Sequence, residues 1–293
     1  PDGFQGDMQV FEYNETKLLP ADLVIVDEVS MLDMEMMYHL LQALHPHCRC
    51  ILVGDADQLP SVGAGAVLHD IIQSQVVPVV RLDTIFRQQE GGRIVTNAHL
   101  INHGRLPVVN ADREFRFIEI QNEEEGATKV CQLYQTECAE AEDKFAVQIV
   151  APMYKNPCGV EHLNAVIQEQ TNASCPGKGE YKNGKTLFRR GDKVMQKQNN
   201  YDKGVFNGDI GEIFSIQQDI IYVRYPEQDV KYEGQEIDEI TLAYAITVHK
   251  SQGSEYNTVI MTIVNSHAVM LQRNLFYTAV TRAKRKVILV GTK

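Results

Sequence analysis

The sequence predicts an α/β protein with parallel sheets, into which a small antiparallel β-barrel is inserted. Short apolar runs rich in β-branched residues alternate along the chain with stretches of helical periodicity. Between about residues 187 and 240 the pattern changes to short strands separated by glycine and asparagine turns. The length of 293 residues allows about two domains at roughly 150 residues each.

The first predicted strands, residues 23–26 and 51–53, flank a predicted helix at residues 34–44. In that helix the apolar residues fall three and four apart on one face: Met37, Leu40, Leu41 and Leu44. Strand, helix and strand together predict a βαβ unit with buried parallel strands. Further buried strands are predicted at residues 145–150, 258–264 and 287–290.

Composition narrows the class of protein. The 28 basic and 39 acidic residues give a net charge of −11, which argues against coating nucleic acid through bulk positive charge but leaves room for a local basic groove. No apolar run approaches the roughly 18 residues of a membrane helix, and no secretion leader is present, so no membrane partner is expected. The six cysteines form no CxxC pair, which favours the reducing cytoplasm.

Two carboxylates, Asp27 and Glu28, directly follow the first predicted strand. Ligands bind at this carboxyl end of the strands in open α/β sheets. Asp27 suits the oxygen shell of Mg²⁺, and Glu28 suits a base for an attacking water. The alternative is an acidic helix start, which the helix dipole favours.

The second strand also ends in polar residues at the same predicted edge. Asp55 and Gln58 lie in the run GDADQLPSVGAG, where the Gln58 amide can bond a γ-phosphate or the attacking water. Gly63 and Gly65 allow close approach of the backbone before a helix starting near Ala66. The alternative is a glycine-rich turn capped by Asp and Gln.

Candidate cationic and polar groups follow along the chain. Arg87 and Arg282 can each neutralise charge on a transferring phosphoryl group, although surface arginines are common. Residues 247–252 are dense in groups that bond nucleic-acid phosphate and sugar, with a solvated loop as the alternative. They are Thr247, His249, Lys250, Ser251 and Gln252.

Six blocks in this order resemble the RecD-like branch of the superfamily 1 helicases, and the match runs almost end to end. They are DEVSM at 27–31, GDADQLPSVGAG at 54–65, IFRQ at 85–88, NGDIG at 207–211, TVHKSQGSE at 247–255 and YTAVTRAK at 277–284. The resemblance implies two RecA-like P-loop NTPase motor units, the first incomplete. Residues 1–88 would be the remainder of motor domain 1A, 89–186 and 241–293 motor domain 2A, and 187–240 an SH3-like 2B barrel.

The resemblance also implies an activity, which is ATP hydrolysis coupled to 5′ to 3′ movement along single-stranded DNA. ATP and Mg²⁺ would be the cofactors, and other recombination or repair subunits are possible partners. Asp27 would hold Mg²⁺ and Glu28 would activate water. Gln58 would sense the γ-phosphate, and Arg87 and Arg282 would contact that phosphate. Asp55, Gly253 and Glu255 would complete the nucleotide site, with Glu255 near the ribose. The DNA contacts would be Ser61, Asn207, Thr247, His249, Lys250, Ser251 and Gln252.

One feature of the family is missing from the sequence. Only 26 residues precede Asp27, and they contain no GxGKT phosphate-binding loop. The expectation is a C-terminal fragment of a helicase that binds ATP poorly and does not hydrolyse it alone. Residues 179–186 match GxxxxGK[ST] as a string, but a predicted strand rather than a helix follows Thr186, so this match is rejected.

Three alternatives remain at the level of sequence. The run HPHCRC at 45–50 crowds four possible zinc ligands, but its spacing is tight and Cys50 is expected to be a small core residue at the start of a buried strand. The chain could be a non-catalytic DNA-binding or partner-binding module. It could also be the helicase part of a conjugative relaxase.

Overall fold

The computed structural model describes residues 11–82, 92–141 and 143–292. They fall into two compact units that divide between Ile85 and Phe86. Unit 1 is the N-terminal part, and unit 2 is the remainder.

Unit 1 is built on two parallel strands, β1 (Leu23–Val26) and β2 (Arg49–Leu52). The 3-10 turn η1 (Val29–Met31) and the helix α1 (Met34–Ala43) connect them, and α2 (Val67–Ser74) follows β2. The α1 helix begins after Asp33, whose carboxylate accepts a hydrogen bond from the Met36 amide. The predicted βαβ unit is confirmed, with β2 beginning at residue 49 rather than 51.

The prediction that these strands are buried is wrong within unit 1. Val26 and Leu52 pack against the apolar cluster formed with α1 and α2, but Ile25 is 61% exposed and Ile51 48%. Successive side chains of a strand point to opposite faces, so one small core shields only alternate residues. Cys50 is also exposed and is not a core residue, although it lies on the same face of β2 as Leu52. Leu41 is exposed as well, although it lies on the predicted face of α1.

Unit 2 contains a parallel sheet in the order β12-β4-β13-β14-β3. Its strands are β3 (Phe115–Glu119), β4 (Val147–Ala151), β12 (Ala245–Thr247), β13 (Tyr256–Ile263) and β14 (Ala283–Gly291). The strands predicted at 145–150, 258–264 and 287–290 correspond to β4, β13 and β14. Most of their residues are buried, as the continuous apolar runs predict.

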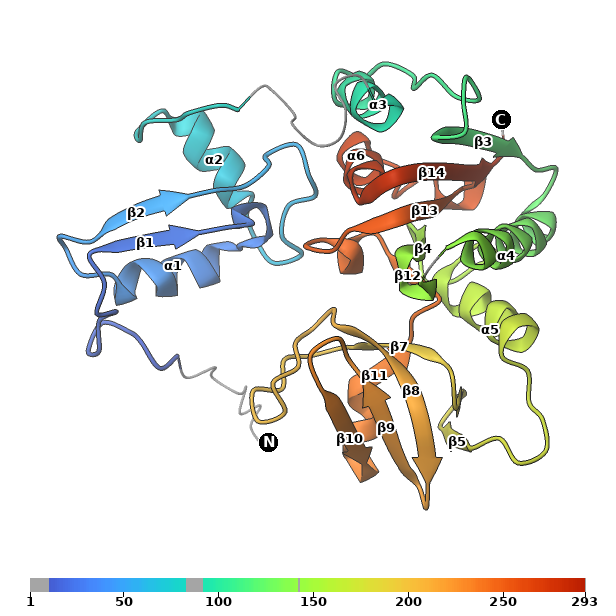
Figure 1. The fold of residues 1–293 in the computed structure, drawn as a ribbon. Helices are drawn as coiled ribbons and strands as arrows, with labels where there is room; N and C mark the ends of the chain where they lie inside the picture. The colour runs from blue at the N-terminus through green and yellow to red at the C-terminus, as the bar shows by residue number, and fades with distance from the viewer. Residues whose placement is uncertain (1–10, 83–91, 142, 293) are drawn as a thin grey trace, which may run out of the picture. The chain divides into compact units, whose positions relative to one another are not determined.

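Helices cover both faces of this sheet (Figure 1). On one side lie α3 (Arg93–Asn102) and α6 (Arg273–Thr281), which pack against each other and against β14. On the other lie α4 (Glu123–Glu140) and α5 (Val160–Thr171). The 3-10 turns η2 (Lys144–Ala146), η4 (His249–Ser251) and η5 (Asn265–His267) lie in the connections.

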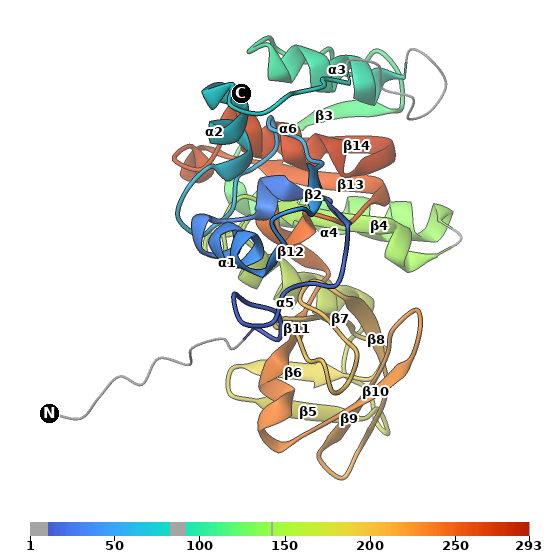
Figure 2. The same ribbon diagram turned by 90° about the vertical axis from the view of Figure 1, so that its left-hand side faces the viewer.

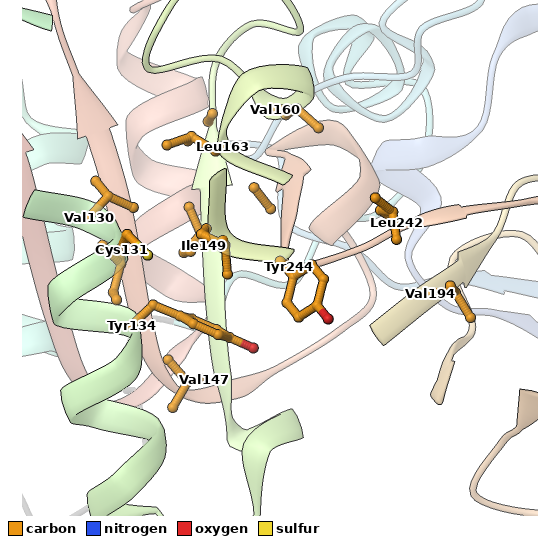
Figure 3. Close-up of a cluster of buried hydrophobic side chains, with 14 of the residues drawn as sticks. Val130, Cys131, Tyr134, Val147, Ile149, Val160, Leu163, Val194, Leu242 and Tyr244 are labelled. Atoms are coloured by element: carbon orange, nitrogen blue, oxygen red, sulfur yellow. The ribbon is translucent and has the colours of Figure 1, made fainter. Parts of the chain in front are cut away.

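An antiparallel sheet occupies the place predicted for the barrel, in the order β10-β9-β8-β7-β11 (Figure 2). Its strands are β7 (Lys193–Gln196), β8 (Ile210–Gln217), β9 (Ile220–Arg224), β10 (Asp229–Glu233) and β11 (Ile240–Leu242). The 3-10 helix η3 (Gly234–Glu239) connects β10 to β11. Its apolar side chains join those of α4, α5 and the parallel sheet in one continuous core. Figure 3 shows this continuity, with Val194 and Leu242 on one side of Tyr244 and Ile149 on the other.

The rejected phosphate-loop string lies in a separate hairpin. The strands β5 (Glu180–Asn183) and β6 (Thr186–Arg189) pair antiparallel around a turn at Gly184, whose φ is +57°. Because a strand follows Thr186, no helix N-terminus is available there to hold phosphate. The structure confirms the rejection.

The chain crosses directly from the antiparallel sheet to the parallel one between β11 and β12, and buried side-chain amides hold the crossing. Asn164 donates to the carbonyls of Leu242 and Ala245 and accepts from the Ala245 amide. Gln148 donates to the carbonyls of Ala243 and Tyr244. These bonds satisfy backbone groups that would otherwise be buried without partners.

Lys193 is fully buried in unit 2. Its Nζ donates to the Val147 carbonyl at 3.1 Å and lies 5.5 Å from the centre of the Phe145 ring. No carboxylate forms an ion pair with it among the described residues, and burial lowers the pKa of Lys193 to about 7. Among the same residues, none of the helices has both the length and the apolar character of a membrane span.

We predict that Lys193→Met stabilises the fold most at about pH 7 and below. The unfolded chain holds the Lys193 proton up to its ordinary pKa and the folded chain releases it from about pH 7, so the cost of the lysine falls as pH rises. The advantage of the variant should shrink by about 1.4 kcal/mol per pH unit between about 7 and 10. Urea unfolding of both proteins at several pH values measures this, and a difference independent of pH would contradict it.

Candidate functional site

The strand β1 delivers the two predicted acids at its carboxyl end. Glu28 lies in the left-handed region, with φ 52° and ψ 39°, and its amide donates to the Asp27 carboxylate at 2.8 Å. This conformation costs about 1–2 kcal/mol for a residue that is not glycine, and such strain is concentrated at functional sites. The bend turns the chain sharply out of the sheet and leaves both acids at its edge.

The loop after β2 lies at the same edge, because the Val29 amide donates to the Val53 carbonyl at 3.0 Å. In this loop the Gln58 side-chain nitrogen donates to Asp55 at 3.2 Å, whereas Gln58 Oε1 is buried without a hydrogen-bond partner in the described residues. Buried polar atoms of this kind are rare and call for a ligand or water. A free acceptor fits a water molecule better than a phosphate oxygen, which needs a donor.

The glycines of this loop permit its close packing. A Cβ on Gly63 would collide with the Asp33 side chain, and a Cβ on Gly65 would meet Met34 at 2.5 Å. Ser61 accepts a hydrogen bond from the Gly63 amide at 3.1 Å. Ala66 precedes the first residue of α2, where the sequence predicted the helix to begin.

The acids at this edge fit Mg²⁺, a hard cation that prefers oxygen ligands. Within the described residues, no cluster of three or more His, Cys, Asp or Glu side chains could hold a metal ion. An Mg²⁺ ion held by Asp27 would therefore complete its shell with waters and phosphate oxygens, as this ion commonly does.

In unit 2 the turn after β12 carries the predicted DNA contacts. The Thr247 hydroxyl accepts from the Lys250 amide at 3.3 Å, and Gly253 has φ +75°. Ser251 is fully buried, and its hydroxyl donates to the Val248 carbonyl at 2.7 Å. A DNA contact by Ser251 would require this hydrogen bond to open, so in this structure Ser251 stabilises the turn.

A hydrogen bond joins this turn to the antiparallel sheet. Lys250 Nζ donates to the side-chain oxygen of Asn207 at 2.6 Å. Asn207 lies in the turn before β8, where its amide donates to Asn199 and the following Gly208 has φ +101°. Two predicted DNA-contact motifs that lie 43 residues apart in sequence therefore meet.

Partial burial shapes the charge of this surface. Burial lowers the pKa of His249, which favours its neutral form at pH 7. Burial also lowers the pKa of Lys250, and the positive charge of Lys197 lowers it further. The surface thus holds two lysines, Lys197 and Lys250, that are close enough to affect each other's charge, in a chain whose net charge is −11.

The third cluster links residues 253–255 to the end of α6. The Arg282 guanidinium is 3% exposed and donates to the carbonyls of Thr278 at 3.3 Å and Ser254 at 3.4 Å. Glu255 forms an ion pair with Lys284 at 3.2 Å. The predicted nucleotide residues Gly253, Glu255 and Arg282 thus lie side by side.

The predicted residues therefore form three groups. Asp27, Glu28, Asp55, Gln58 and Ser61 lie in unit 1, residues 247–252 meet Asn207 in unit 2, and Gly253 and Glu255 adjoin Arg282. Gln252 lies in the turn, and its amide donates to the His249 carbonyl. Arg87 lies outside the described residues.

Sequence reasoning missed an exposed aromatic pair, Tyr201 and Phe206, beside Asn207. The available signal was the run NNYDKGVFNGD, in which two aromatic residues lie in a glycine-containing turn.

Three family models match the chain in succession. They are the AAA domain at residues 4–123, the SH3 domain of ATP-dependent RecD-like DNA helicases at 163–225, and the UvrD-like helicase C-terminal domain at 242–290. The SH3 match overlaps the antiparallel sheet.

The chain is 37% identical over 97% of its length to the ATP-dependent RecD2 DNA helicase of Deinococcus radiodurans. It belongs to the RecD-like helicase family. It is also 30% identical, again over 97% of its length, to the RecBCD enzyme subunit RecD of Mycolicibacterium smegmatis. The chain spans 38% and 52% of the lengths of these two relatives.

Solved structures agree on the fold of this RecD-like chain. A Pif1 helicase from Bacteroides in complex with ADP-AlF3 and ssDNA matches with a TM-score of 0.58 at 18% identity, covering 92% of this chain and 70% of that one. Pif1 helicase from Candida albicans matches with a TM-score of 0.56 at 17% identity, covering 92% and 71%. The predicted fold, RecA-like α/β with an SH3-like insertion, is confirmed.

We predict that Ser251→Ala destabilises unit 2 by about 0.5–1.5 kcal/mol, because the Val248 carbonyl loses one of its two donors and keeps the Ser251 amide. Thermal unfolding measures the change. Thr128→Ala, on an exposed part of α4, is the control and should cost less. Equal stability of Ser251→Ala and the unaltered chain would show that this hydroxyl does not hold the turn.

Proposed function

We propose that this RecD-like protein couples ATP hydrolysis to 5′ to 3′ movement along single-stranded DNA. The observation that carries the proposal is the 2.6 Å hydrogen bond between Lys250 and Asn207. It gathers polar and cationic groups from two separate motifs at the end of β12, and such groups bind the phosphates and sugars of nucleic acid. The similar structures of Bacteroides Pif1 helicase hold bound ssDNA, which supports the same substrate class.

We assign the hydrolytic steps to the first group of residues. Asp27 holds Mg²⁺, which neutralises phosphate charge when bound, and Glu28 accepts a proton from the attacking water. Gln58 orients that water through Oε1, the acceptor without a partner in the described residues. Asp55 holds the Gln58 amide in place at 3.2 Å.

The remaining roles rest on residues of unit 2, on Ser61 of unit 1 and on the resemblance of the IFRQ motif at 85–88. Arg282 and Arg87 stabilise the γ-phosphate, and Gly253 and Glu255 hold the rest of the nucleotide. Thr247, His249, Lys250, Gln252, Asn207 and Ser61 contact DNA, while Ser251 acts through the turn that it holds. Residues 1–88, 89–186 with 241–293, and 187–240 are the proposed motor domains 1A and 2A and barrel 2B.

The proposal also covers the partners of the protein, its cellular compartment and its binding of ATP. The relatives named as subunits of the RecBCD enzyme favour an association with other recombination or repair subunits. Six free cysteines suit a reducing cytoplasm. Because these 293 residues contain no GxGKT loop, we expect them to bind ATP poorly alone, and hydrolysis is best tested in the protein at its natural length.

We predict that Glu28→Gln lowers DNA-stimulated ATP hydrolysis at least about 100-fold, since an amide cannot take the proton of the attacking water. Phosphate release with and without oligothymidylate measures it. Glu35→Gln, which removes an exposed acid from the first turn of α1, is the matched control and should leave the rate near that of the unaltered protein. Retained activity in Glu28→Gln would overturn the assignment.

A second prediction concerns charge. Lys250→Ala should weaken binding of single-stranded DNA and make it less dependent on salt by about 0.7–1 in the log–log slope, because one phosphate contact is lost. Lys185→Ala removes the same charge from the β5–β6 turn and should not change the slope. Fluorescence anisotropy measured at salt concentrations between about 20 and 200 mM separates the two variants. An unchanged slope in Lys250→Ala would place the DNA elsewhere.

A further inference from the structure

The turn between β7 and β8 presents two aromatic side chains to solvent. Tyr201 is 78% exposed and Phe206 46%. Their ring centres lie 5.8 Å apart at an interplanar angle of 74°, an edge-to-face pair. Large aromatic surfaces that remain exposed in a folded protein are typical of binding sites.

This turn is held rigidly. The amides and carbonyls of Asn200 and Val205 bond each other at 2.8 and 3.1 Å, and the Asn200 side chain accepts from the Lys203 amide. Gln228, outside the turn, donates to the carbonyls of Lys203 and Gly204, each at 2.8 Å. The aromatic pair is thus positioned before any ligand binds, which lowers the entropic cost of binding.

The aromatic pair is continuous with the candidate DNA surface. Phe206 directly precedes Asn207, which accepts the hydrogen bond from Lys250 at 2.6 Å. The charge of Lys197, the residue after β7, acts on Lys250 as well. Aromatic rings beside a cationic track are the arrangement that binds single strands, because bases stack on the rings while the phosphates lie near the cations.

We propose that Tyr201 stacks against a base of the single strand, supported by the edge-to-face contact with Phe206. The inference rests on the proposed function and adds a contact to the bases to the contacts with phosphate and sugar. Since every base has a π-face, this contact tolerates any sequence, and it holds one nucleotide at the barrel next to the strand bound by Lys250.

The test compares a normal with a partly abasic oligonucleotide of equal length and charge. Anisotropy with labelled oligothymidylate at low salt should show Tyr201→Ala binding on the order of tenfold more weakly than the unaltered protein at its natural length. Its affinity for the abasic strand should be unchanged. Tyr201→Phe keeps the stacking face and should bind both strands as the unaltered protein does.

Tyr222→Ala is the matched control, since Tyr222 is an aromatic residue of the same sheet whose ring centre lies 6.0 Å from that of Phe214. It should not discriminate between the two strands. Unchanged binding in Tyr201→Ala, or equal loss on both strands, overturns the stacking role while leaving the proposed function intact. If the unaltered protein binds neither strand, the proposed function fails and this inference fails with it.

Discussion

The crossing from the antiparallel to the parallel sheet is the constraint on which the candidate DNA surface depends. Four consecutive residues, 242–245, pass through the core, where Asn164 and Gln148 bond their carbonyls. Asp192 extends this network by accepting from Tyr244 at 2.9 Å, although burial raises the pKa of its carboxyl. Because the crossing is held in this way, the turn that follows β12 reaches the turn that precedes β8. The bond between Lys250 and Asn207 is the result.

Unit 1 contains two features that lower its stability, and both lie at the edge that carries the predicted acids. Its sheet has two strands in the described residues, yet its first loop keeps Glu28 in a strained conformation and its second leaves Gln58 Oε1 buried without a partner there. Both features cost free energy in the absence of ligand. They are understandable if nucleotide, metal and water complete the edge, as proposed for a member of this family.

The fold was largely predictable because its strands are continuous apolar runs and its helices have apolar residues at the helical spacing. The edge carrying Asp27 and Gln58 was predictable as well, since parallel strands align their carboxyl ends. Contacts between residues far apart in the sequence were not predictable. Nothing in the sequence fixes Lys250 beside Asn207, buries Ser251 or exposes Cys50, because each depends on how separate elements pack. Tyr201 and Phe206 were missed because aromatic residues normally indicate core.

The central claim is that residues 199–209 and 247–253 form one surface for a single strand. Hydrogen–deuterium exchange with and without oligothymidylate tests it most directly. We expect slower exchange in peptides from both segments together, and no change in the β5–β6 hairpin. Protection confined to one segment, or found only elsewhere in the chain, would contradict the account.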